Sequence, residues 1–244
     1  MTGHQELEDP RRRWLVQALG LGVLAGALPG TALGQSAFGS QPGKLPAGRS
    51  IYRAVGEVFV NGKPADMSAL IKPGDTIRTG KGAELVFAVG AQAMIVRADS
   101  ELSIDGIVDA VKGPLLDALR LITGKLLSVS RNAKMSVRTP TATIGIRGTG
   151  WYAEADPEKT YFCTCYGTTD VSAADDPNSR ETVESRHHDR PLYVLSKPSG
   201  GKSILPGPFI NHTDQELMLI EALVGRAPPF VFPNDAYSGP RRGY

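Results

Sequence analysis

The chain has 244 residues, with 27 Lys and Arg against 25 Asp and Glu, so its formal net charge is only +2. This balance argues against a polyanionic partner such as nucleic acid, and a hydrophobic content of 41% argues against a disordered chain. The 28 glycines and 18 prolines are more than a helix bundle tolerates, and two cysteines are too few for a disulfide scaffold. The composition therefore favours many short strands joined by turns.

The N-terminal segment predicts an export signal. Residues 11–13 are three arginines, Trp14 follows them, and an Ala-, Leu- and Gly-rich stretch ends near Gly34. Basic residues before a moderately apolar run that ends in small residues are typical of a signal peptide. The arginines and Trp14 resemble the twin-arginine motif, which implies that a folded protein is exported to the periplasm. We expect a signal peptide over residues 1–34, a soluble mature chain, and membrane contact only if cleavage fails.

The mature chain begins with a linker and continues as short strands. Residues 35–50 are rich in Gly, Pro, Ser and Gln, which is typical of a flexible linker. From Ile51 onward, apolar side chains recur at every second position, and turn sequences such as Asn61-Gly62 separate the runs at intervals of about 8–12 residues. This pattern predicts a mainly β fold, an antiparallel or solenoid-like β-sandwich or barrel of short strands with one or two peripheral helices.

Two segments are predicted to be the helices. Residues 113–122 carry four leucine or isoleucine side chains at helical spacing, which predicts a short amphipathic helix over one end of the sheet. Near the C-terminus, Thr213 followed three residues later by Glu216 forms a capping box, and Gly225 marks the end of the predicted helix. We expect this second helix to pack on an open face or edge of the sheet.

Several motifs in the β-rich part follow one another in a specific order. They are Gly56-Glu57-Val58, Pro73-Gly74-Asp75-Thr76-Ile77-Arg78-Thr79-Gly80, Glu84-Leu85-Val86-Phe87, Gly124-Lys125-Leu126, Thr139-Pro140-Thr141-Ala142 and Gly145-Ile146-Arg147-Gly148-Thr149. Together, over residues 51–173, they resemble the FecR domain. Members of this family are envelope proteins, and the namesake relays a ferric-siderophore signal from an outer-membrane receptor to a sigma factor.

The resemblance implies a β-rich periplasmic module for binding, sensing or signalling, whose partner is an unidentified periplasmic protein or ligand. Residues 1–10 are too few for a cytoplasmic anti-sigma domain, so we do not expect the relay across the membrane. Residues 174–230 are expected to form a C-terminal extension whose helix packs on the β domain, and residues 231–244 a flexible tail.

Five side chains in the second half of the chain are candidates for a metal site. Cys163 and Cys165 lie two residues apart in a predicted strand, so both point to one side of it, while their Cα spacing is at the upper limit for a disulfide. Thiolates and imidazoles bind zinc, iron and copper, and His187, His188 and His212 could complete the set. Neighbouring histidines in an extended chain face opposite ways, so we expect only one of the pair to join the two thiols and His212.

Other interpretations of these residues stay open. The cysteines could be small buried hydrophobic side chains or a reversible redox pair, and the histidine pair could be an ordinary polar loop. The alternative functions are a metal-dependent or redox-active envelope enzyme and a structural module that contacts the cell wall. The sequence contains neither a P-loop nor a G-x-S-x-G elbow, and no carboxylate pair stands out as a hydrolase dyad. We therefore predict no catalytic residue and favour a binding module over an enzyme.

Overall fold

A computed structural model describes residues 42–176 and 178–230, without the side chains of residues 131–133. The predicted signal peptide, the first part of the predicted linker and the predicted 231–244 tail lie outside the described residues. From residue 43 onward the described chain belongs to one compact unit. None of the helical structure in this described part is long and apolar enough to span a bilayer.

The prediction of a mainly β fold is confirmed, and the sheet is open rather than closed into a barrel. The described residues form thirteen strands and one helix. The strands are β1 (Ile51–Val55), β2 (Val58–Val60), β3 (Lys63–Pro64), β4 (Thr76–Thr79), β5 (Glu84–Val89), β6 (Gln92–Val96), β7 (Glu101–Asp109), β8 (Gly113–Arg138), β9 (Ala142–Ala155), β10 (Lys159–Ala173), β11 (Arg180–Ser185), β12 (Leu192–Ser199) and β13 (Lys202–Pro206), and the helix is α2 (Asp214–Leu223).

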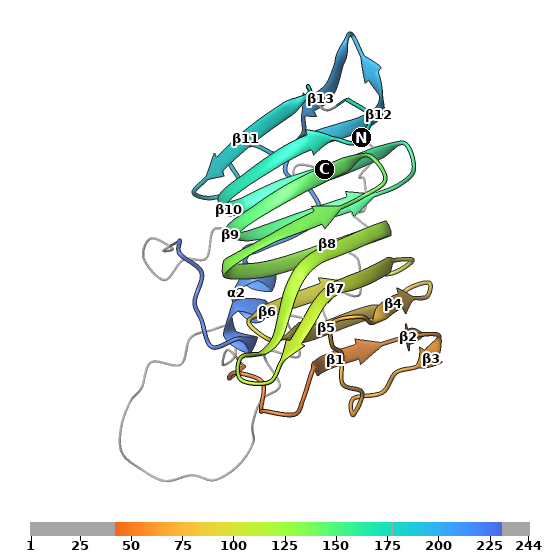
Figure 1. Ribbon diagram of the computed structural model, residues 1–244, viewed down its shortest axis with the longest axis vertical. Coiled ribbons are helices and arrows are strands. Elements are labelled where there is room, and N and C mark those ends of the chain that lie inside the picture. The colour runs from red at the N-terminus through yellow and green to blue at the C-terminus, as the bar shows by residue number, and fades with distance from the viewer. Residues whose placement is uncertain (1–41, 177, 231–244) are drawn as a thin grey trace, which may run out of the picture. The chain divides into compact units, whose positions relative to one another are not determined.

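The strands stack side by side from β1–β3 to β11–β13 (Figure 1). Neighbours pair in the order β13-β12-β10-β9-β8-β7-β4-β2-β3, with β11 on β10 and with β1, β5 and β6 joined to β8. The longest strand changes partners along its length, because residues 113–123 of β8 pair with β7 and residues 126–130 lie between β6 and β9. The change occurs at Gly124, whose φ of 93° is a conformation that favours glycine.

The helix predicted over residues 113–122 is wrong, because this segment is the first part of β8. It forms an antiparallel hairpin with β7, closed where Asp109 pairs with Gly113. The Asp109 carboxylate accepts hydrogen bonds from two backbone N–H groups of the turn, at Val111 and Lys112. A short apolar run fits helical and strand spacing alike, and here the adjacent strand supplies the backbone hydrogen-bond partners that decide between the two.

The helix predicted near the C-terminus is confirmed. The Thr213 side chain accepts a hydrogen bond from the backbone N–H of Glu216, and the Glu216 carboxylate accepts one from the backbone N–H of Thr213. The chain leaves the helix at Gly225, which has a φ of 73°. Helix α2 packs against β5, β6 and β8 through apolar side chains that include the buried Leu217 and Ile220.

The sheet is buried on both of its faces around β10. Phe162 belongs to the main hydrophobic core, whereas its neighbour Cys163 is equally buried but lies outside that core. Alternate side chains of a strand point to opposite faces, so Cys163 and Cys165 share the face opposite Phe162. The chain on either side of Thr213 covers this second face, and the candidate site lies beneath it.

Candidate metal site

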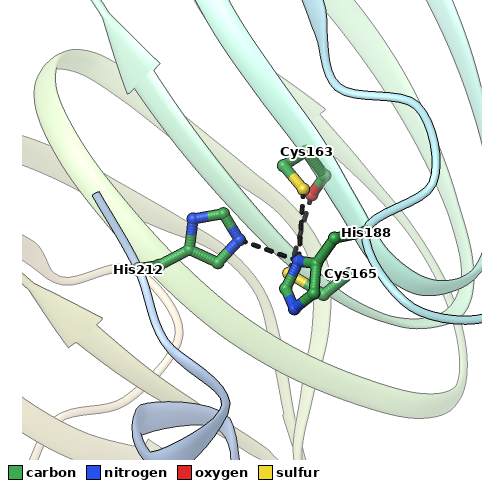
Figure 2. A group of neighbouring side chains, drawn as sticks. All are labelled: Cys163, Cys165, His188 and His212. Atoms are coloured by element: carbon green, nitrogen blue, oxygen red, sulfur yellow. Dashed lines mark hydrogen bonds between the residues drawn. The ribbon is translucent and has the colours of Figure 1, made fainter. Parts of the chain in front are cut away.

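Three separate segments bring two cysteines and two histidines together (Figure 2). Cys163 and Cys165 come from β10, His188 from the loop between β11 and β12, and His212 from the residue before the N-cap of α2. One ligand atom from each lies within 4.8 Å of all the others, and all four residues are buried. We call these four residues the Cys/His group.

The structure therefore gathers four of the five candidate residues and leaves His187 outside. The backbone decides which histidine of the pair turns inward: His188 has a φ of 55°, and its N–H donates a hydrogen bond of 2.9 Å to the carbonyl oxygen of Cys165. A positive φ is uncommon for a residue other than glycine, and here it coincides with a side chain that enters the site. The sequence alone could not show this turn of the backbone.

The outer nitrogens of both imidazoles bond to acceptors. His188 Nε2 lies 2.9 Å from Oδ1 of Asp214, and His212 Nδ1 lies 2.7 Å from the carbonyl oxygen of Ile210. Both partners only accept in their usual states, so these outer nitrogens carry the ring protons. In neutral imidazoles, the inner nitrogens then present lone pairs toward the centre of the Cys/His group.

The inner nitrogens face one another and a thiol sulfur at close range. His188 Nδ1 lies 3.1 Å from His212 Nε2 and 3.4 Å from Cys163 Sγ. A tetrahedral zinc ion with Zn–N bonds of about 2.0–2.1 Å and Zn–S bonds of about 2.3 Å places nitrogens about 3.4 Å apart and nitrogen and sulfur about 3.6 Å apart. The two nitrogens and the Cys163 sulfur therefore lie within about 0.3 Å of the spacing that ligands of a single zinc ion would have.

In the metal-free Cys/His group, the surroundings shift the pKa values of Cys163, Cys165 and His188 in different directions. Burial alone would raise the pKa of the Cys163 thiol, but hydrogen bonds from Cys165, His188 and His212 hold that pKa well below its usual value. Burial and the adjacent Cys163 raise the pKa of Cys165 well above its usual value. Burial would lower the pKa of His188, yet Asp214 and Cys163 raise it to about 9. Without an ion, Cys165 and His188 therefore hold their protons more tightly, and Cys163 less tightly, than free side chains do.

A carboxylate that the sequence analysis did not assign to the site supports the histidines from outside. Asp214 is fully buried, and its two oxygens lie 2.9 Å from His188 Nε2 and 2.8 Å from His187 Nε2. Burial would raise the pKa of Asp214, but the two histidines hold it below its usual value. A carboxylate behind a ligand histidine fixes the tautomer and orients the ring in metal sites. The signal for this role was present in the sequence, because Asp214 is two residues from His212 in the first turn of a predicted helix.

A stacked tyrosine ring and a partly buried ion pair fix the position of His212. The ring of Tyr152 stacks on that of His212, with centroids 4.5 Å apart. Arg97 donates hydrogen bonds to the carbonyl oxygen of Asn211 and to the carboxylate of Glu216, at 2.9 and 2.8 Å. These contacts hold the chain before and after the N-cap of α2 against the sheet, and with it the imidazole of His212.

The same side chains also form a cysteine–histidine–aspartate series. Cys163 Sγ contacts His188 Nδ1, and Asp214 contacts the other nitrogen of that ring, which is the order found where a base activates a thiol nucleophile. In this protein Cys163 has no exposed surface, and Cys165 and His212 lie close to it as well. Four buried ligands around one point match a closed metal site more closely than a catalytic site with an open position.

The comparisons with known proteins are sparse. The chain matches no protein-family model and no curated protein. Among solved structures it is similar to two crystal structures of a "putative anti-sigma factor" from Parabacteroides distasonis, at 14% identity and with TM-scores of 0.42 and 0.43. The similarity covers 54% of this chain and 58% of that chain. At this level it identifies no family, and we take neither function nor partner from it.

Proposed function

We propose that this chain is an exported FecR-like binding module whose Cys/His group holds one divalent transition-metal ion. The observation that carries the proposal is that one ligand atom from each of two buried cysteines and two buried histidines lies within 4.8 Å of all the others, while the outer nitrogen of each imidazole bonds to an acceptor. The outer acceptors keep the outer ring protons in place, so the inner nitrogens are the ones that can bind a cation when His188 gives up its inner proton. A metal ion there also receives the two thiolates, which gives it four soft or borderline ligands.

Charge favours a divalent ion over copper(I), and the ligand geometry suits zinc. Two thiolates neutralise a divalent ion, whereas a copper(I) ion would leave one further negative charge in a fully buried site, where unbalanced charge is costly. Zinc also accepts a tetrahedral set of two sulfurs and two nitrogens without any electronic preference for another geometry. We therefore expect zinc in the native protein, with iron and copper as the alternatives that metal analysis would reveal.

The proposed location follows from the N-terminal sequence. The three arginines and Trp14 resemble a twin-arginine signal, and that route carries folded proteins, so the ion would be acquired in the cytoplasm before export. The binding or sensing role, with a periplasmic protein or ligand as the partner, rests on the FecR-like motifs. The alternative of a metal-dependent enzyme requires a coordination position open to substrate, which four buried protein ligands do not offer.

Elemental analysis of protein folded and purified from the cytoplasm tests the proposal. We expect about one zinc ion per chain, as a single four-ligand site requires, and loss of that ion in Cys163→Ser. Thr164→Ser is the matched control, because Thr164 lies between the two cysteines but points to the opposite face, and serine keeps the hydroxyl that contacts Thr169. A metal-free wild-type protein of full stability would refute the proposal, as would an ion that Cys163→Ser retains.

A further inference from the structure

All four side chains of the Cys/His group are buried, so the group needs a route by which an ion arrives. A buried ligand set can load through a general opening of the chain or through a more exposed ligand that receives the ion first. Only the second route requires a partly exposed metal ligand beside the buried site. The structure contains a candidate for the second route.

His187 and Asp214, which we call the outer pair, lie between the Cys/His group and solvent. The side chain of His187 is 37% exposed, whereas that of Asp214 is 0% exposed. His187 Nε2 lies 2.8 Å from one carboxylate oxygen of Asp214, and His188 Nε2 lies 2.9 Å from the other. Ligand atoms of His187, His188 and Asp214 all lie within 4.8 Å of one another, and imidazole and carboxylate are both zinc ligands.

His188 connects the outer pair to the Cys/His group. One nitrogen of its ring contacts Asp214, and the other contacts Cys163 and His212. An ion held at the outer pair is therefore separated from the thiolate by the width of one imidazole ring. The negative charge of Asp214 attracts a cation to this position, and the two sulfurs of the Cys/His group, which bind divalent ions as thiolates, attract it further inward.

We infer that His187 and Asp214 are the loading ligands of the metal site. A divalent ion first binds His187 Nε2 and the Asp214 carboxylate, and then passes the ring of His188 to the Cys/His group. The ion keeps its charge throughout, and any protons that it displaces from its ligands leave to solvent. This inference rests on the proposed function and adds the path by which the site is filled.

A purely structural role for His187 predicts the opposite kinetics. If this histidine only held Asp214 in place, its removal would loosen the surroundings of the site and leave loading unchanged or faster. If it receives the ion, its removal slows loading and, since the same path serves both directions, slows release as well. The equilibrium affinity then changes little.

Stopped-flow mixing of metal-free protein with Co²⁺, followed by thiolate-to-cobalt absorption, separates the two roles. His187→Asn keeps a hydrogen-bond donor for Asp214 but supplies a poor ligand, and we expect it to load roughly tenfold more slowly, the scale on which a single supporting ligand acts. The end point should remain one ion per chain. His187→Cys should restore the rate, and Arg186→Ala, an exposed neighbour, should match the wild type.

Loading of His187→Asn at the wild-type rate or faster would overturn the inference while leaving the proposed function intact. A wild-type protein that takes up no Co²⁺ or Zn²⁺ would contradict the proposed function and this inference together. Transfer to a competing chelator measures release in the same samples. Slower release in His187→Asn by the same factor as slower loading is the result expected.

Discussion

The outward ring protons of His188 and His212 determine what the inner nitrogens of the Cys/His group can bind. Asp214 fixes the tautomer of His188, and the carbonyl oxygen of Ile210 fixes the tautomer of His212. Once the ion is held by the Cys/His group, Asp214 acts through His188, without contacting the ion, as a positioning residue. Its removal should therefore weaken binding of the ion without abolishing it.

We expect Asp214→Asn to lower the affinity for Zn²⁺ about 10- to 100-fold, the effect typical of losing a carboxylate behind a ligand histidine. Asparagine has nearly the same shape, but its neutral amide neither attracts the cation nor favours one tautomer as a carboxylate does. Competition with a chelator of known affinity measures the change. Glu184→Gln, an exposed carboxylate on β11, should bind Zn²⁺ as the wild type does.

Metal uptake should release about two protons per ion near neutral pH, because the ligands must lose their protons to bind. The pKa of His188 is raised to about 9, so in the metal-free state this ring stays protonated below that pH. The raised pKa of Cys165 keeps its thiol protonated as well. Affinity for the ion should consequently rise with pH, more steeply below about 9, where His188 and Cys165 are both protonated, than above it, where only Cys165 is. Calorimetry in buffers of different ionisation enthalpy counts the protons, and uptake without proton release would contradict this assignment.

At the scale of the elements, the sequence predicted those features that depend only on neighbouring residues in the chain. The alternation of β10 placed Cys163 and Cys165 on one side, and the capping box placed the start of α2, with His212 directly before its N-cap. Side-chain periodicity predicted a helix for residues 113–122, where the structure has a strand. The strand is determined by pairing with β7, and that partner lies outside residues 113–122. The choice of His188 over His187 could not be predicted either, since it depends on a positive φ.

The strand at residues 113–122 predicts unequal costs for two similar substitutions. Leu119 is 0% exposed and belongs to the main core, whereas Ile122 is 47% exposed. Leu119→Ala should lower the free energy of unfolding by about 2–5 kcal/mol, and Ile122→Ala by less than about 1 kcal/mol. Denaturant titration measures both values. Equal losses would favour the amphipathic helix, in which the two side chains share one buried face.

At the scale of the whole molecule, the Cys/His group joins segments that are distant in the chain. Strand β10, the loop after β11 and the start of α2 meet in this group, and Arg97, which follows β6, holds the start of α2 through Asn211 and Glu216. An ion bound by ligands from all three segments stabilises the folded state, because the unfolded chain does not hold those ligands together. The ion should therefore affect the stability of the entire β unit.

Chelation should lower the midpoint of thermal unfolding by roughly 10 °C, which corresponds to about 4 kcal/mol of linked binding at a free-ion concentration of about 1,000 times Kd. Scanning calorimetry with and without a strong chelator measures this shift. Cys163→Ser is the control, since a chain without the site should unfold at the same temperature in both conditions. If chelation leaves the unfolding midpoint of the wild type unchanged, the ion does not stabilise the folded state and the prediction is contradicted.

X-ray absorption at the metal edge tests the central claim most directly, on wild-type protein purified from the cytoplasm without added metal. The account predicts a zinc ion with two sulfur neighbours at about 2.3 Å and two nitrogen neighbours at about 2.0–2.1 Å. A coordination shell without sulfur, or a protein with no stoichiometric metal, would contradict it.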